Sequence, residues 1–173
     1  MVTLMLGLLA SQAQVPKLET RPAFFVYFTP GFGPGLGRNE FEVAIWADGK
    51  VIWRDKLPIW QRKNGKWAIL ASDYVEANVG PAKVRAALDR IETAGAFRMD
   101  RQGEQWVDSS YTTIQVLDGR RKLRLYASVE PTHTPSPPWA KAWVLVRKEV
   151  KSLIPKAGKH RKRPDDTLWK LPE

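Results

Sequence analysis

FEVAIWADGKVIWR, residues 41–54, decides the fold that we expect for this chain. Two runs of strand-forming residues are joined by Asp48-Gly49, a dipeptide typical of tight β-hairpins. A three-residue loop that ends at Gly49, with Gly49 in the left-handed conformation, places the apolar side chains of both runs on one face. These side chains are Phe41, Val43, Ile45, Val51 and Trp53. The stretch therefore predicts a sheet with one apolar face, and it contains no reactive group.

Three further stretches predict strands. Residues 22–28 are dense in aromatic and branched residues, which favour strands. Asn64-Gly65 joins residues 57–63 to 66–70, and Asp118-Gly119 joins 111–117 to 122–126, so both are hairpin candidates. In the last of these, a two-residue turn puts one set of side chains on a shared face: Thr112, Ile114, Leu123 and Leu125. We expect its other face, with Gln115, Lys122 and Arg124, to be solvated and basic.

Two stretches have the apolar spacing of helices. Residues 81–94 follow a capping Gly80 and end before Gly95, with Val84, Ala87, Leu88 and Ile91 on one stripe. A second helix is expected from about Pro138, capped by Ser136, to the Ile154-Pro155 boundary. Its apolar stripe contains Trp139, Ala142, Trp143, Val146, Val150 and Leu153. Together the patterns predict an α+β fold for residues 22–154: an antiparallel sheet of hairpins with one packed helix, a ββαββ core, plus a C-terminal helix.

The two ends of the chain differ from this domain. Residues 1–10 are apolar and uncharged, and Ser11-Gln12-Ala13 offers the small residues that a signal peptidase reads. We expect residues 1–13 to be a signal peptide cleaved before Gln14, which would make the protein secreted or periplasmic. An apolar run this short does not span a bilayer. The alternative is a buried N-terminal segment in a cytoplasmic protein. Residues 155–173 are predicted to be a basic, disordered tail.

The amino-acid composition excludes several kinds of functional site and favours one kind of partner. The chain has no cysteine, so thiolate metal sites, disulfides and catalytic thiols are impossible. Its two histidines, His133 and His160, are far apart in polar sequence, and we expect neither a metal nor a cofactor. The formal net charge of +10 favours an anionic partner: an envelope polymer, an acidic protein or, less well, a nucleic acid.

The candidate binding residues are basic. Arg62, Lys63 and Lys66 surround a hairpin tip with neighbouring tryptophans, an arrangement that can also hold single-stranded nucleic acid. Lys159, Arg161, Lys162 and Arg163 form a second basic group in the predicted tail. The function expected from these features is non-catalytic binding, or a structural role, in the cell envelope. The alternative partner is a nucleic acid in the cytoplasm.

A hydrolase is the less favoured alternative. Asp108, Ser109 and His133 are the residue types of a nucleophilic site, because a serine needs a base and the base an orienting carboxylate. Ser109 does not lie in a Gly-x-Ser-x-Gly elbow, and His133 lies in a proline-rich connector. An Asp followed by serines before a strand is more typical of a turn. We therefore predict no catalytic residue.

The order of these motifs resembles that of an uncharacterised family of exported bacterial proteins and lipoproteins. The resemblance covers residues 24–126: the Asp48-Gly49 hairpin, the helix at 81–94, Phe97, then Asp108 before Tyr111-Thr112-Thr113-Ile114 and the Asp118-Gly119 hairpin. It implies a ββαββ core and export, without an established activity. This chain lacks the cysteine to which a lipid would be attached, and it adds the Asn64-Gly65 hairpin and the basic tail.

Overall fold

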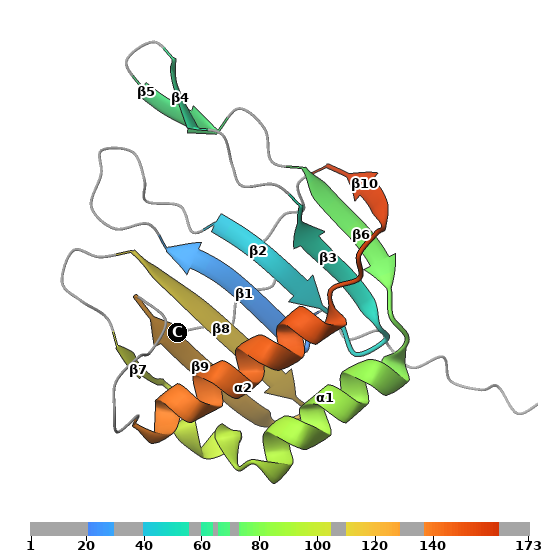
Figure 1. The fold of residues 1–173 in the computed structure, drawn as a ribbon, viewed down its shortest axis with the longest axis vertical. Helices are drawn as coiled ribbons and strands as arrows, with labels where there is room; N and C mark the ends of the chain where they lie inside the picture. Colours follow the sequence, from blue (N-terminus) through green and yellow to red (C-terminus); the bar gives the residue numbers. More distant parts are fainter. Residues whose placement is uncertain are drawn as a thin grey trace, which may run out of the picture.

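An eight-stranded sheet forms the centre of the structure, and both α-helices cover one of its faces (Figure 1). The computed structural model describes residues 21–29, 40–55, 60–63, 66–69, 73–104, 110–128 and 137–162. The strands are β1 (Phe24–Thr29), β2 (Glu40–Ile45), β3 (Lys50–Arg54), β4 (Trp60–Lys63), β5 (Lys66–Ile69), β6 (Tyr74–Asn78), β7 (Gln102–Glu104), β8 (Tyr111–Asp118), β9 (Arg121–Ala127) and β10 (Lys159–Arg161). The helices are α1 (Pro81–Thr93), the short 3₁₀ helix η1 (Ala96–Met99) and α2 (Pro138–Leu153).

The strand order of the large sheet is β10-β6-β3-β2-β1-β8-β9-β7. All neighbouring strands are antiparallel except β7 and β9, which are parallel. The early strand β1 pairs with β2 on one side and with β8 on the other, so it joins the two hairpins that the sequence predicts into one sheet. The predicted α+β class, with a mostly antiparallel sheet, is confirmed.

The main core lies between the sheet and the two helices. The predicted stripe of α1 is confirmed, because Val84, Ala87, Leu88 and Ile91 are its buried residues. Gly80 precedes α1 with a φ of +83°, and Gly95 follows it with a φ of +69°. In α2 the predicted residues Ala142, Trp143, Val146, Val150 and Leu153 are buried, whereas Trp139 is only partly buried. The structure thus packs two helices, where the sequence predicted one packed helix, against the same side of the sheet.

The β2–β3 hairpin has the predicted three-residue loop. Ile45 pairs with Val51, the amide of Trp46 donates to the carbonyl of Lys50 at 2.8 Å, and Gly49 has a φ of +90°. One side chain is on the other face, however. Tyr27 pairs with Phe41 and Val26 with Val43, so Glu42 is an extra residue in β2 and the alternation shifts. Phe41 therefore lies in a cluster on the sheet face away from the helices, and its predicted place beside Val43 is wrong.

The β8–β9 hairpin has a two-residue turn, as predicted. Gly119 and Arg120 form this turn, because Asp118 pairs with Arg121. The turn is one residue later than the Asp118-Gly119 dipeptide suggested. Ile114, Leu123 and Leu125 share the apolar face as predicted and are fully buried. The expected solvation of the other face is wrong at Gln115, which is only 3% exposed.

The third predicted hairpin is present as a separate two-stranded sheet. In β4 and β5, Arg62 pairs with Trp67 and Lys63 pairs with Lys66. The predicted pairing of the two runs that flank Asn64-Gly65 is thus confirmed.

The C-terminal segment corrects another prediction. Of the residues for which we predicted a disordered tail, Lys159–Arg161 form β10, which pairs with the outer strand β6. Gly158 permits this close approach: a Cβ there would lie 2.5 Å from the carbonyl oxygen of Glu76 and 2.8 Å from Cη2 of Trp53. Arg161 also forms an ion pair with Glu76. Strand pairing and this ion pair offset the chain entropy that favours disorder in so basic a segment.

Candidate anion-binding surface

The exposed face of α2 is basic. Lys141, Lys148 and Lys151 are exposed and share one line on the helix with Val144, because these positions are separated by three, four and three residues. Val144 is 53% exposed and is the single large apolar side chain exposed in the described part of the chain. Residues 141–151 extend over roughly 15 Å of helix axis at the usual rise per residue. The outer side of α2 therefore presents a straight row of ammonium groups.

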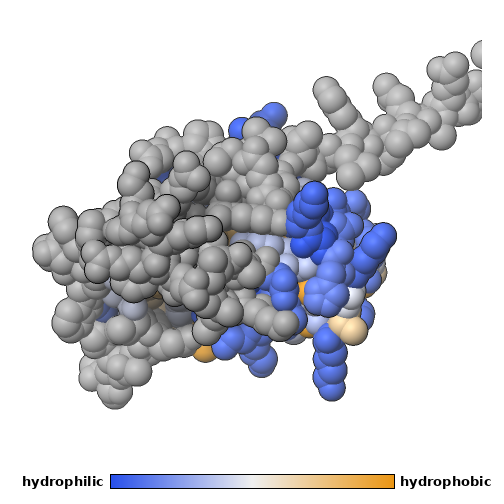
Figure 2. All heavy atoms as spheres, turned by 90° about the horizontal axis from the view of Figure 1, so that it is seen from above, coloured by the Kyte–Doolittle hydropathy of each residue, from blue (hydrophilic) through white to orange (hydrophobic). Residues whose placement is uncertain are grey.

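Further exposed lysines follow α2 in the sequence. Lys156, Lys159 and Lys162 are exposed on the segment that leads into and through β10. We call the exposed lysines of α2 and of this segment the lysine surface: Lys141, Lys148, Lys151, Lys156, Lys159 and Lys162. Figure 1 places β10 and β6 at the right of the sheet, and from above (Figure 2) hydrophilic side chains gather at that same side.

The charges that could neutralise this surface are engaged elsewhere. Residues 137–162 contain one acidic residue, Glu149, and its side chain is only 7% exposed, bound to Arg90 of α1. That hydrogen-bonded contact with Glu149 raises the pKa of Arg90 above its ordinary value. Arg147 forms an ion pair with Glu42 of β2 at 3.4 Å. Within the described residues, no lysine of the lysine surface has a carboxylate partner.

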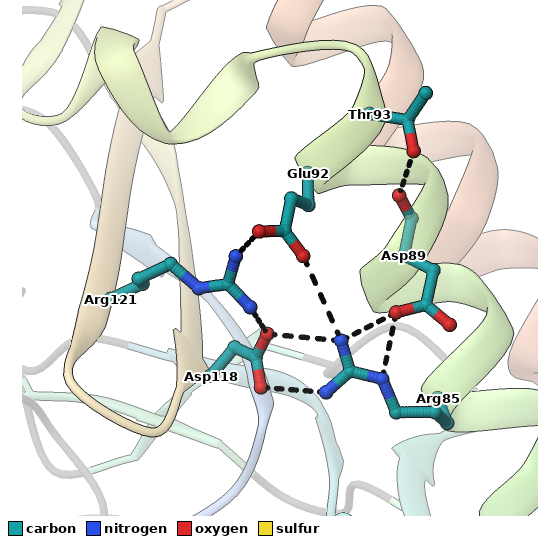
Figure 3. A network of polar contacts seen from close by, with 6 residues as sticks. All are labelled: Arg85, Asp89, Glu92, Thr93, Asp118 and Arg121. Atoms are coloured by element: carbon teal, nitrogen blue, oxygen red, sulfur yellow. Dashed lines mark hydrogen bonds and ion pairs between the residues drawn. The ribbon is translucent and has the colours of Figure 1, made fainter.

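A second charged cluster has the opposite character (Figure 3). Arg85 binds Asp118 at 2.9 Å and Asp89 at 2.5 Å, and Arg121 binds both Asp118 and Glu92. The cluster joins α1 to the β8–β9 turn, and its two guanidinium groups are matched by three carboxylates. Because each charged group already has a partner of opposite sign, this cluster stabilises the packing of α1 and is not a candidate binding site.

The structure places the predicted site residues in different situations. Lys159 and Lys162 belong to the lysine surface, whereas Arg161 is bound to Glu76 and serves to hold β10. Arg62, Lys63 and Lys66 lie on the β4–β5 sheet. The remaining candidates, Arg163, Asp108, Ser109 and His133, lie outside the described residues, as do residues 1–13.

The sequence reasoning missed the basic residues of α2. Lys141, Lys148 and Lys151 have helical spacing on the side opposite the apolar stripe, and that signal was available in the sequence. The sequence could not show that Glu149 is buried. Its position beside Lys148 suggests an exposed acid, and only the packing of α1 against α2 brings it to Arg90.

In the described part of the chain, no three His, Asp or Glu side chains lie in a position to hold a metal ion. None of the helices described has the length and apolar character needed to cross a bilayer. No protein-family model matches the sequence, and no curated protein matches it either. The resemblance to a family of exported proteins therefore stays a prediction.

Proposed function

We propose that this protein is an exported, non-catalytic binding module that holds an anionic polymer of the cell envelope on its lysine surface. The observation that carries the proposal is the contrast between two sets of charges. Glu149, Arg147 and Arg161 are paired within the fold, whereas the exposed lysines beside them lack carboxylate partners in the described residues.

The arrangement suits a long partner better than a small one. Each exposed lysine contributes little by itself, since a surface ion pair is worth about 0–1 kcal/mol. The row along α2 can contact several phosphates or carboxylates of one chain together, and each contact releases counterions. We therefore expect affinity to fall steeply with salt.

The binding experiment uses a glycerol phosphate polymer as the probe, titrated by calorimetry from low to moderate salt. K148Q/K151Q/K156Q removes three charges from the lysine surface, and K83Q/R120Q/K122Q removes three exposed charges from α1 and the β8–β9 hairpin. We expect the first variant to lower the slope of log affinity against log salt by about one per lysine, and the control to change it much less. Equal losses in both would overturn the proposal, because binding would then follow net charge alone.

The same titration with single-stranded DNA separates the envelope partner from a nucleic acid. Tighter binding of DNA than of the polymer, lost in the lysine variant, would replace the proposed partner by a nucleic acid. Export is tested independently by the intact mass of the protein in cytoplasmic, envelope and medium fractions of its host. We expect a chain that begins at Gln14 in the exported fractions, and an uncleaved cytoplasmic chain would contradict export.

A further inference from the structure

A cleft lies at one end of the helical layer, where α1 ends and α2 begins. It is lined by Ala94, Gly95, Ala96 and Met99 from α1 and η1, and by Pro138, Lys141, Ala142 and Leu145 from α2. Its volume is about 280 Å³. A dry cavity of roughly 150 Å³ in another protein admits benzene, so this cleft has room for a short alkyl segment.

The small residues at the helix ends explain why the cleft exists. Ala94, Gly95 and Ala96 offer at most a methyl group where the chain passes from α1 into η1, and Gly95 has the left-handed φ of +69°. On the facing helix Ala142 also offers only a methyl group, while Leu145 and Met99 supply larger apolar walls. The walls can therefore bury apolar groups, and water inside would find few hydrogen-bonding side chains.

Among the described residues, Lys141 is the one charged residue of the lining. No carboxylate lines the cleft, and Lys141 has no ion pair in the part of the chain that the structure describes. Lys148, the next lysine of the row, lies roughly 10 Å further along the helix axis, beyond direct reach of a small ligand in the cleft. An apolar recess with a single cation is complementary to a molecule with an apolar tail and one anionic head.

We propose that this cleft binds a monomeric, single-chain anionic amphiphile, with its alkyl tail between α1 and α2 and its acid group on the Lys141 ammonium. A free molecule fits better than a bilayer. Docking on a bilayer needs exposed apolar side chains, and Val144 alone provides one among the described residues, whereas the apolar surface at the cleft is recessed. This site and the proposed polymer-binding site have one residue in common, Lys141, and the inference rests on the proposed function in that respect alone.

The test uses octanoate below its micelle concentration, with calorimetry for affinity and stoichiometry. We expect one octanoate to bind per chain, at least tenfold more tightly than either of two control compounds. Acetate has the acid group without the alkyl tail, and octyltrimethylammonium has the tail with the opposite charge. Equal binding of octanoate and octyltrimethylammonium would overturn the role of Lys141. Equal binding of octanoate and acetate would overturn the role of the apolar walls.

Three variants assign the site. A94F fills the cleft from an exposed position, K141Q removes the charge, and K148Q is the matched control outside the cleft. We expect A94F and K141Q each to lower the affinity for octanoate at least fivefold, and K148Q to leave this affinity unchanged. If A94F does not fold, K141Q against K148Q still decides, because both lysines are exposed. Equal affinities of those two variants would overturn the proposal.

Two further arms separate this site from its alternatives. The first arm measures binding of the protein to vesicles of phosphatidylglycerol. If the protein binds them tightly, and if K148Q/K151Q lowers this affinity while A94F does not, the ligand is a bilayer and not the free amphiphile. The glycerol phosphate polymer should bind A94F normally. For the parent protein, a failure to bind octanoate with normal binding of the polymer would contradict the cleft alone, and binding of octanoate without binding of the polymer would contradict the proposed function alone.

Discussion

Arg90 on α1 and Glu149 on α2 form a two-pronged ion pair between the helices. Nε of Arg90 donates to Oε1 at 2.9 Å, and a terminal guanidinium nitrogen donates to Oε2 at 2.6 Å. The Glu149 side chain is 7% exposed and that of Arg90 is 54% exposed. The carboxylate is therefore held away from water by the packing of the two helices, and the guanidinium closes over it from the solvent side.

Removing Arg90 should destabilise the fold more than replacing both partners by apolar residues. R90M leaves the buried carboxylate without its partner, whereas R90M/E149L removes the buried charge as well. We expect the melting temperature of R90M to lie below that of the double variant, measured by thermal unfolding. Additive effects of R90M and E149L in a double-mutant cycle would show that the two groups are not coupled.

Two glycines with positive φ should differ in their response to alanine. In G49A the new Cβ would lie 2.5 Å from backbone atoms of Gly80, while at Gly119 nothing lies within 4 Å. G119A should cost only the strain of the left-handed region, about 1–2 kcal/mol. We expect G49A to cost more, because the hairpin turn must move away from the start of α1. Urea unfolding measures both, and equal losses would contradict a tight contact between Gly49 and Gly80.

Gly158 should control whether β10 stays on the sheet. Its Cβ in G158A would meet the backbone of Glu76 and the ring of Trp53, so β10 must shift or detach. We expect faster hydrogen exchange of the amides of β10 in G158A, with α1 unchanged. A157S, one residue earlier at an exposed position, is the control. Unchanged exchange in β10 would mean that the segment does not pack as tightly as the structure shows.

Asp89 makes stability depend on pH in the acid range. Hydrogen bonds from Arg85 lower the pKa of Asp89 below its ordinary value of 3.8. The unfolded chain therefore binds this proton more readily, and the contribution of Asp89 is complete above 3.8 and is lost as the pH falls through its native pKa. We expect D89N to lower stability at neutral pH and to match the parent in strong acid.

That dependence is measured by urea unfolding over a pH series. D55N is the control, since Asp55 is exposed and forms no ion pair among the described residues. A difference between D89N and the parent that stays constant down to strong acid would contradict the assigned direction. High salt should reduce the difference at neutral pH, because the groups involved are exposed.

Much of the local structure could be predicted because its signals lie within a few residues. For α1, Gly80 and Pro81 mark the start, the apolar spacing marks the buried face and Gly95 marks the end. The loop of the β2–β3 hairpin follows in the same way from Asp48-Gly49 and the alternation of its strands. These features depend on chain geometry and on the period of the apolar residues, which the sequence states directly.

Long-range pairing could not be predicted in this way. The partner of β1 decides which residues of β2 face the helices, and the extra residue there sends Phe41 to the opposite cluster. β10 has the composition of a disordered tail, and it is ordered through β6, Trp53 and Glu76, which are some 80 residues or more earlier in the chain. The composition of a segment does not indicate which distant residues it will contact.

The amino-acid sequence by itself determined the α+β class, the positions of both helices and of the three hairpins, and the excess of positive charge. The tertiary structure decided which of those charges are free. Packing α1 against α2 buries Glu149 under Arg90, and pairing β10 with β6 brings Arg161 to Glu76. The exposed lysines between them keep no carboxylate partner in the described chain, because distance in space, and not spacing in sequence, sets the energy between charges.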